Sequence, residues 1–174
     1  MTSVAAQTQA DTLLKQQVNM VVAIIRGFDQ GFTRGVYQLN TYKIDDQCLA
    51  QNTGDAIFQI YNDVRDGKVD EAWNDIVAAY NIFYYTDNKC NLKDLLWDIV
   101  QFCDYNDCTS QTILNNMLAK VFVMTGNINS IAQIIYQTQP ALVDLNAYTE
   151  LYTTVGTNVG QMFQSIFDFK PILK

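Results

Sequence analysis

Three glycines stand four residues apart in the segment "GFDQGFTRG". Residues with this spacing are neighbours on the surface of an α-helix, so Gly27, Gly31 and Gly35 would form one strip without side chains. Each glycine inside a helix destabilises it by about 1 kcal/mol relative to alanine, so such a strip calls for a compensating contact. Gly156 and Gly160 repeat the spacing in the last part of the chain. We therefore expect these five glycines to mark close packing between two helices, either within one molecule or between assembled copies.

Apolar residues recur at spacings of three and four along most of the chain, which is the period of an α-helix with one buried face. The longest such stripe consists of Leu14, Val18, Val21, Ile25, Phe28 and Phe32. No segment alternates as a half-buried strand does, and the only prolines are Pro140 and Pro171. The sequence predicts an all-α fold: a single helical domain over residues 1–174, built as a bundle of about five to six helices, with irregular tails at 1–8 and 169–174.

The later helices can be placed from their caps and apolar faces. They are predicted at 54–66, at 69–86, after an Asn91 cap, after a Thr109 cap with a break or kink at 125–127, and from about Pro140 onward. The helix at 54–66 is expected to turn Ile57, Ile60, Tyr61 and Val64 inward.

The four cysteines, Cys48, Cys90, Cys103 and Cys108, lie at the ends of predicted helices. None belongs to a CxxC pair and the chain has no histidine, so the spacing of zinc ligands is not met. Four cysteines allow three disulfide pairings. We favour Cys48–Cys90, which would tie the start of the second helix to the end of the third, and Cys103–Cys108, which would close the turn between the fourth and fifth helices. The alternative is four free thiols in a cytosolic protein, whereas disulfides indicate an oxidising compartment.

Several of these features together resemble a known family. They are "GFDQGFTRGVY", a cysteine about a dozen residues later, a helical hairpin closed by a second cysteine, and the final "GTNVGQMFQSIFDF". They are similar to a large set of small secreted helical proteins of ciliates and related protists, over roughly residues 20–168. The resemblance implies secretion and a disulfide-stapled helical fold, and it assigns no catalytic residues.

The net charge is −7, and the acidic residues are concentrated in the middle of the chain. Residues 45–108 contain thirteen acids and four bases, a net charge of −9. Nucleic acids are bound through clusters of basic residues, so nucleic-acid binding is not expected. No apolar run has the length of a transmembrane segment. We expect a secreted or luminal protein whose leader has been removed.

Motifs for catalysis or cofactor binding are missing from the sequence. Without histidine, the usual general base and the Ser-His and Cys-His pairs are absent. No GK[ST] follows the glycines, as it would in a phosphate-binding loop. The turn "DYND" lacks the glycine and glutamate of an EF-hand loop, so we interpret it as a capping turn. We assign no catalytic residue, no metal site and no cofactor, and we do not expect an enzyme.

Two functional hypotheses follow. The first is a secreted structural protein that associates with copies of itself into an extracellular filament, matrix or surface layer. The glycine strips, the lightly charged ends and the disulfides favour it, because a filament subunit must be rigid and must repeat one contact without closure. The second is a luminal carrier that encloses an apolar small molecule or lipid among its ten tyrosines and nine phenylalanines.

Overall fold

The structure of the protein, a computed structural model, describes residues 2–138 and 140–170. These residues form helices and no strands, so the all-α prediction is confirmed, with one helix more than the five to six expected. The seven α-helices and one short 3-10 helix are α1 (Thr2–Tyr37), α2 (Gln51–Arg65), η1 (Val69–Glu71), α3 (Ala72–Lys89), α4 (Leu92–Tyr105), α5 (Ser110–Ala119), α6 (Val121–Gln137) and α7 (Leu145–Phe167).

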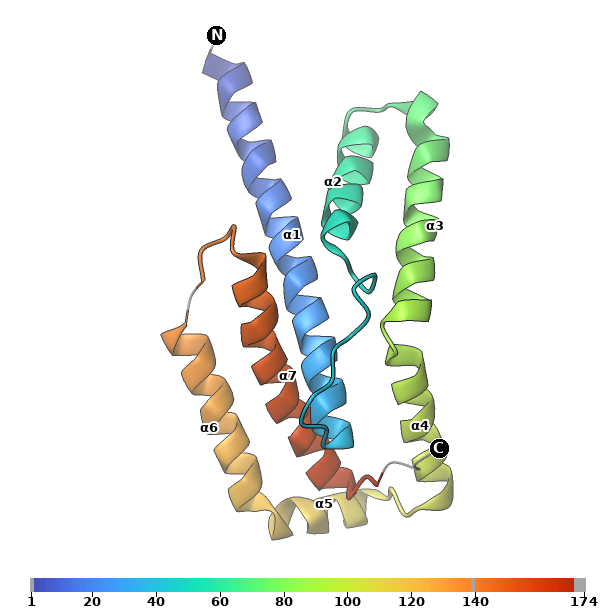
Figure 1. Cartoon of the computed structure of the whole chain (residues 1–174), viewed down its shortest axis with the longest axis vertical. Coiled ribbons are helices and arrows are strands. Elements are labelled where there is room, and N and C mark those ends of the chain that lie inside the picture. The colour runs from blue at the N-terminus through green and yellow to red at the C-terminus, as the bar shows by residue number, and fades with distance from the viewer. Residues whose placement is uncertain (1, 139, 171–174) are drawn as a thin grey trace.

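The first and last helices lie side by side at the centre of the molecule and run in the same direction (Figure 1). Two parallel helices so far apart in sequence require the chain between them to travel back and forth. It rises through α2, descends through α3 and α4, crosses the base in α5 and rises again in α6 (Figure 1). As a result, α2, α3 and α4 lie on one side of the α1–α7 pair, and α6 lies on the other.

The five glycines lie at the contact between α1 and α7 within one chain. A β-carbon on Gly31 would overlap the carbonyl oxygen of Thr153 and lie 2.7 Å from the backbone nitrogen of Thr157. From the other side, a β-carbon on Gly160 would lie 2.9 Å from the Cα atom of Gly35. The two backbones are therefore close enough to exclude any side chain at these positions, which is why the sequence places glycine there.

Threonines on α7 occupy the remaining positions along this contact. The hydroxyls of Thr149, Thr153 and Thr157 each donate to the carbonyl four residues earlier, at 2.9, 2.7 and 2.8 Å. A threonine hydroxyl that donates to its own helix needs no partner across the interface. Small, internally satisfied side chains thus extend the glycine strip without holding the helices apart.

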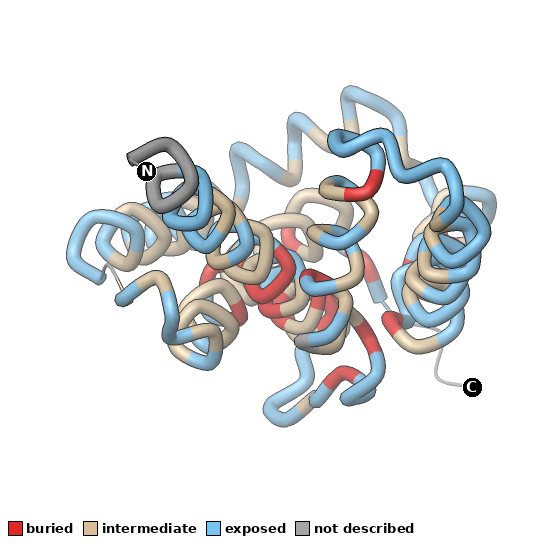
Figure 2. The backbone as a smooth tube through the Cα atoms, turned by 90° about the horizontal axis from the view of Figure 1, so that it is seen from above, coloured by how far each residue is buried: buried red, intermediate tan, exposed pale blue. Residues whose placement is uncertain are grey.

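An aromatic cluster closes the lower end of the bundle, where α1, α4 and α7 meet. Its buried members are Val36, Leu95, Phe102 and Phe169. The Phe102 and Phe169 rings are 5.0 Å apart. Nearby, the Tyr37 hydroxyl donates to Asp98 at 2.6 Å, so α4 is attached to α1 by a polar contact as well. Buried residues gather around the central pair, whereas the outer helices are mostly exposed or intermediate (Figure 2).

Both favoured disulfides, Cys48–Cys90 and Cys103–Cys108, are present. Cys48 and Cys90 are fully buried together with Ile44, in a second small cluster that joins the loop after α1 to the end of α3. Cys103–Cys108 closes the turn between α4 and α5 and packs against the aromatic cluster.

Some predicted helix boundaries are confirmed and others are wrong. Thr109 caps α5, where its hydroxyl accepts from the backbone nitrogen of Thr112. The break in the next segment falls at Lys120, where the chain bends by 78°, and not at 125–127, which lies inside α6. The last helix begins at Leu145 rather than near Pro140, because the Asp144 side chain provides the cap by accepting from the Ala147 nitrogen at 3.0 Å.

The predicted tails also differ from the structure. Residues 2–8 continue α1 rather than forming an irregular tail. Residues 169–170 are irregular, yet Phe169 is among the most buried side chains of the molecule. Residues 171–174 lie outside the described residues.

The prediction of which apolar faces point inward is wrong for α2 and for part of α1. Ile57, Tyr61 and Val64 on α2 are exposed, although Ile60 is partly covered. On α1, Val21 and Ile25 are about half exposed. The reason is that α1 approaches α7 along its glycine strip, so the neighbouring apolar stripe is turned away from the contact.

Alanine at Gly31 tests the close contact of α1 and α7. We expect Gly31→Ala to lower the free energy of unfolding by about 2 kcal/mol or more, because its methyl group would overlap backbone that cannot move independently. Gly126→Ala is the matched control, since Gly126 is also inside a helix but has open space around it. The free energy of unfolding of this control should rise by up to about 1 kcal/mol, because alanine favours a helix more than glycine does. Chemical denaturation measures the free energy of unfolding of both variants. Equal changes in the two variants would contradict the close packing of α1 and α7.

Removal of each disulfide should lower the free energy of unfolding by an amount that depends on the length of the loop it closes. The sequence separations are 42 for Cys48–Cys90 and 5 for Cys103–Cys108. On the chain-entropy account, Cys48→Ala/Cys90→Ala should lose about 4 kcal/mol of unfolding free energy, and Cys103→Ala/Cys108→Ala about 2 kcal/mol. Thermal denaturation of the two double variants shows which disulfide stabilises the protein more. A larger loss of stability on removal of Cys103–Cys108 would contradict the prediction.

Candidate functional site

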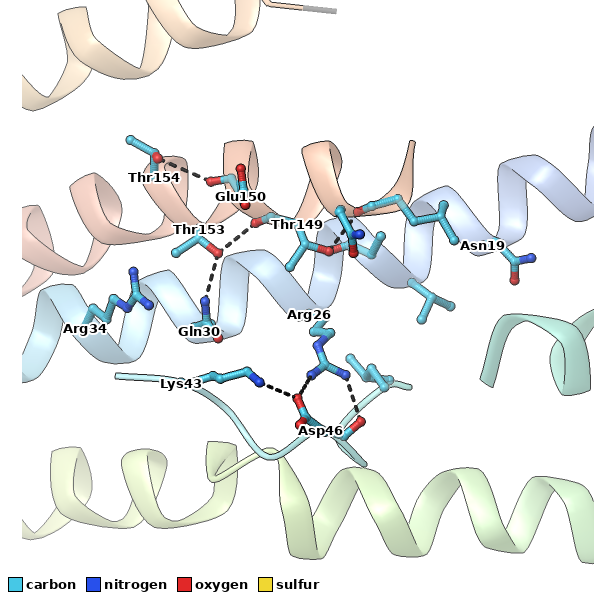
Figure 3. A pocket seen from close by; sticks show the side chains of 15 residues that line it. Asn19, Arg26, Gln30, Arg34, Lys43, Asp46, Thr149, Glu150, Thr153 and Thr154 are labelled. Atoms are coloured by element: carbon cyan, nitrogen blue, oxygen red, sulfur yellow. Dashed lines mark hydrogen bonds and ion pairs between the residues drawn. The ribbon is translucent and has the colours of Figure 1, made fainter. Parts of the chain in front are cut away.

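A polar cleft lies between α1, the start of α7 and the loop that follows α1 (Figure 3). Its volume is about 780 Å³. The lining includes the charged and polar side chains Arg26, Gln30, Arg34, Lys43, Asp46, Thr149, Glu150 and Thr153. Its composition makes it the first place to look for a ligand or for chemistry.

The polar side chains of α1 in this cleft hold the loop in place. Arg26 donates to the carbonyls of Asp46 and Cys48, at 3.1 and 2.7 Å, and forms an ion pair with the Asp46 carboxylate. Arg34 donates to the carbonyl of Tyr42 at 2.7 Å. These guanidinium groups therefore supply hydrogen-bond donors to backbone carbonyls of the loop.

Gln30 connects the same loop to the last helix. Its side-chain oxygen accepts from the backbone nitrogen of Ile44 at 3.1 Å, and its nitrogen donates to the Thr153 hydroxyl at 3.3 Å. One side chain therefore bridges α1, the loop and α7, and Figure 3 shows its bond to Thr153 on α7. The arrangement positions a loop and does not form an acid–base pair, and its charged lining does not suit an apolar ligand.

These bridging residues were missed when the sequence was interpreted, although it contains a signal for them. Arg26, Gln30 and Arg34 are spaced by four, each one position before a glycine of the strip. A polar row next to a glycine strip faces the edge of the helix contact, where a loop can be attached. None of the five glycines or four cysteines singled out in the sequence lines the cleft.

Behind the loop lies a buried carboxylate, Asp29, beside the Cys48–Cys90 disulfide. The Asp29 side chain is buried, and neither carboxylate oxygen has a hydrogen-bond partner among the described residues. Burial raises the pKa of Asp29 to about 6. The nearest carboxylate oxygen and the two sulfur atoms lie within 4.8 Å of one another. The sulfurs are bonded to each other, so this group does not offer the thiolates that a metal site would need.

Two apolar faces lie on the outer helices. The α3 face consists of Val69, Trp73, Ile76, Tyr80 and Phe83, which are 59–83% exposed. The α6 face consists of Val121, Phe122, Ile128, Ile135 and Tyr136, which are 47–89% exposed. Neither α3 nor α6 contains a single buried residue. Exposed apolar surface on this scale marks an interaction surface, so these faces are the best candidates for a functional site.

The chain was compared with protein-family models, curated proteins and solved structures, and none of them matches it. Among the described residues, no single helix is both long and apolar enough to cross a membrane. Helices α5 and α6 reach that length and composition only as a pair, bent by 78°.

Asp29 should make stability depend on pH in a characteristic direction. Because its pKa is about 6 in the folded protein and near 3.8 in the unfolded chain, the folded state holds the proton more tightly. The stabilisation that Asp29 gives to the folded state by binding this proton is therefore fully present below pH 3.8 and is lost as the pH rises through about 6. We expect Asp29→Asn to remove this loss and to be more stable than the wild type at pH 7 by about 1–3 kcal/mol.

Denaturation curves of both proteins from pH 4 to 8 measure the effect. The difference between the two curves isolates Asp29, because the other titrating carboxylates are common to both proteins. These include Asp55, whose pKa is lowered by its hydrogen bond with Asn19, and Asp75, whose pKa is raised by burial. A constant difference across this range would show that Asp29 is ionised at no extra cost in the folded state.

Proposed function

We propose that this protein is a structural subunit that associates with copies of itself outside the cell or in a lumen, forming a filament, matrix or surface layer. The observation that carries the proposal is the exposure of the α3 and α6 faces. Helices in proteins owe most of their stability to an apolar face packed against other elements. Helices α3 and α6 have such faces but bury no residue within the chain. Association with further copies would supply the missing cover.

The total surface of the chain supports the same proposal. The accessible surface is 11264 Å². A folded monomer of 19.8 kDa is expected to expose about 8,600 Å². The excess of about 2,600 Å² is larger than the area of about 800 Å² that each partner contributes to a standard interface. One subunit thus has surface for more than one contact, as an extended assembly requires.

Disulfides and the central helix pair support a structural role for the subunit. Cys48–Cys90 and Cys103–Cys108 fix the ends of α3, α4 and α5, the elements next to the exposed faces. Disulfides form and persist in oxidising compartments, which favours a secreted or luminal location. A subunit held in this way presents its faces in a constant geometry, and repeated contacts then give an ordered assembly.

The alternative, a carrier for an apolar small molecule or lipid, stays a prediction. Such a carrier needs a concave, mostly apolar pocket. The cleft in Figure 3 has Val22, Ala23, Leu49 and Leu145 in its lining, but most of its lining residues are polar or charged, so it is not a mostly apolar pocket. The apolar side chains of α3 and α6 lie on outward faces instead.

Sedimentation of the non-reduced wild-type protein at increasing concentration tests the proposal. We expect the mean mass to rise steadily between about 1 µM and about 1 mM, since weak repeated interfaces have dissociation constants in this range. The polymers should contain no component other than the chain itself. A monomer over the whole range would contradict the proposal, and a monomer that carries a tightly bound small molecule would support the carrier instead.

A further inference from the structure

We infer that assembly is head-to-tail: the α6 face of one copy packs against the α3 face of the next. This inference rests on the proposed function and adds the identity of the contact surfaces. The occupant of each face is a second copy of this chain, bound through the opposite face.

Helices α3 and α6 lie on opposite flanks of the α1–α7 pair (Figure 1), and each carries one of the two exposed apolar faces. A contact between two different surfaces of one molecule is heterologous. It leaves one free face at each end, so it adds copies into an open chain unless its rotation closes a ring. A contact between two identical faces, in contrast, ends at a dimer.

The charges around the two faces favour contact between unlike faces. Residues 69–89, which form η1 and α3, contain four acids and one base, a net charge of −3. Two α3 faces in contact would bring these acids together, and like charges opposite each other in an interface oppose binding. Residues 110–137, which form α5 and α6, contain Lys120 as their only charged residue. The α6 face is therefore an electrostatically acceptable partner for the acidic α3 face.

Both faces combine aromatic rings with branched side chains. The α3 face presents Trp73, Tyr80 and Phe83 beside Val69 and Ile76, and the α6 face presents Phe122 and Tyr136 beside Val121, Ile128 and Ile135. Interface cores are depleted in charge and enriched in aromatic residues, which act as anchors in apolar surroundings. A membrane surface is a poorer occupant of the α6 face, because helices that lie on membranes carry Lys and Arg on their polar side and α6 carries neither.

Two double variants, each disabling one face, separate these arrangements. The α3 variant is Trp73→Asp/Phe83→Asp, and the α6 variant is Phe122→Asp/Tyr136→Asp. The four side chains are at least 72% exposed, so their replacement leaves the core intact. Circular dichroism and melting temperature confirm the folding of each variant. Leu39→Asp, at an exposed apolar residue in the loop after α1, is the matched control and should assemble as the wild type does.

Native mass spectrometry and sedimentation are then applied to each variant alone and to an equimolar mixture. Head-to-tail contact predicts that each variant alone is a monomer and that the mixture forms a 1:1 dimer and stops there, since only one complementary pair of faces remains. A dimer of either variant by itself would overturn the inference, because it would show that identical faces associate.

The remaining outcomes distinguish failure of the inference from failure of the proposed function. If the wild type assembles and both variants still form polymers, the contact lies elsewhere and only the inference fails. If the wild type stays monomeric, the proposed function fails and the inference with it. A last measurement is sedimentation with phosphatidylcholine vesicles. If the wild type sediments with the vesicles and the α6 variant does not, the α6 face binds a membrane surface and the inference is overturned.

Discussion

The backbone-to-backbone contact between α1 and α7 is the constraint on which the rest of the structure depends. Five glycines and three threonines leave no large side chain along the line where the helices meet. Because the two helices are parallel and come from opposite ends of the chain, every intervening element has to pack outside this pair. The contact therefore determines that α3 and α6 are peripheral helices, exposed on opposite flanks.

A core built on backbone proximity buries less apolar surface than a core built on large side chains. Most of the buried apolar side chains form two small clusters, one rich in aromatic residues below the helix pair and one around Cys48 and Cys90. Helix α2 is attached to α1 by polar contacts such as the ion pairs of Arg65 with Asp11 and Lys15 with Asp55. The disulfides and these contacts complement a small core, and much apolar surface is left exposed on the outer helices.

The sequence predicted the fold class from the helical period of its apolar residues and the close approach of two helices from the spacing of their glycines. It predicted the cysteine pairing from the positions of the cysteines at the ends of predicted helices. It did not predict which face of each helix is covered. Periodicity shows that Trp73, Tyr80 and Phe83 share a face of α3, but whether that face meets the core or another molecule depends on tertiary packing. Asp29 was missed for a related reason: its burial is set by the loop and disulfide that lie against it, and those contacts are not local in sequence.

Hydrogen exchange followed by mass spectrometry, at low and at high protein concentration, tests the central claim most directly. The account predicts that peptides from α1 and α7 around the glycine contact are the best protected at both concentrations, because that contact is internal to each copy. Peptides from α3 and α6 should exchange quickly in the dilute protein and become protected together as the concentration rises. Equal protection of α3 and α6 at both concentrations would contradict the account, since it would mean that their apolar faces are covered within a single chain.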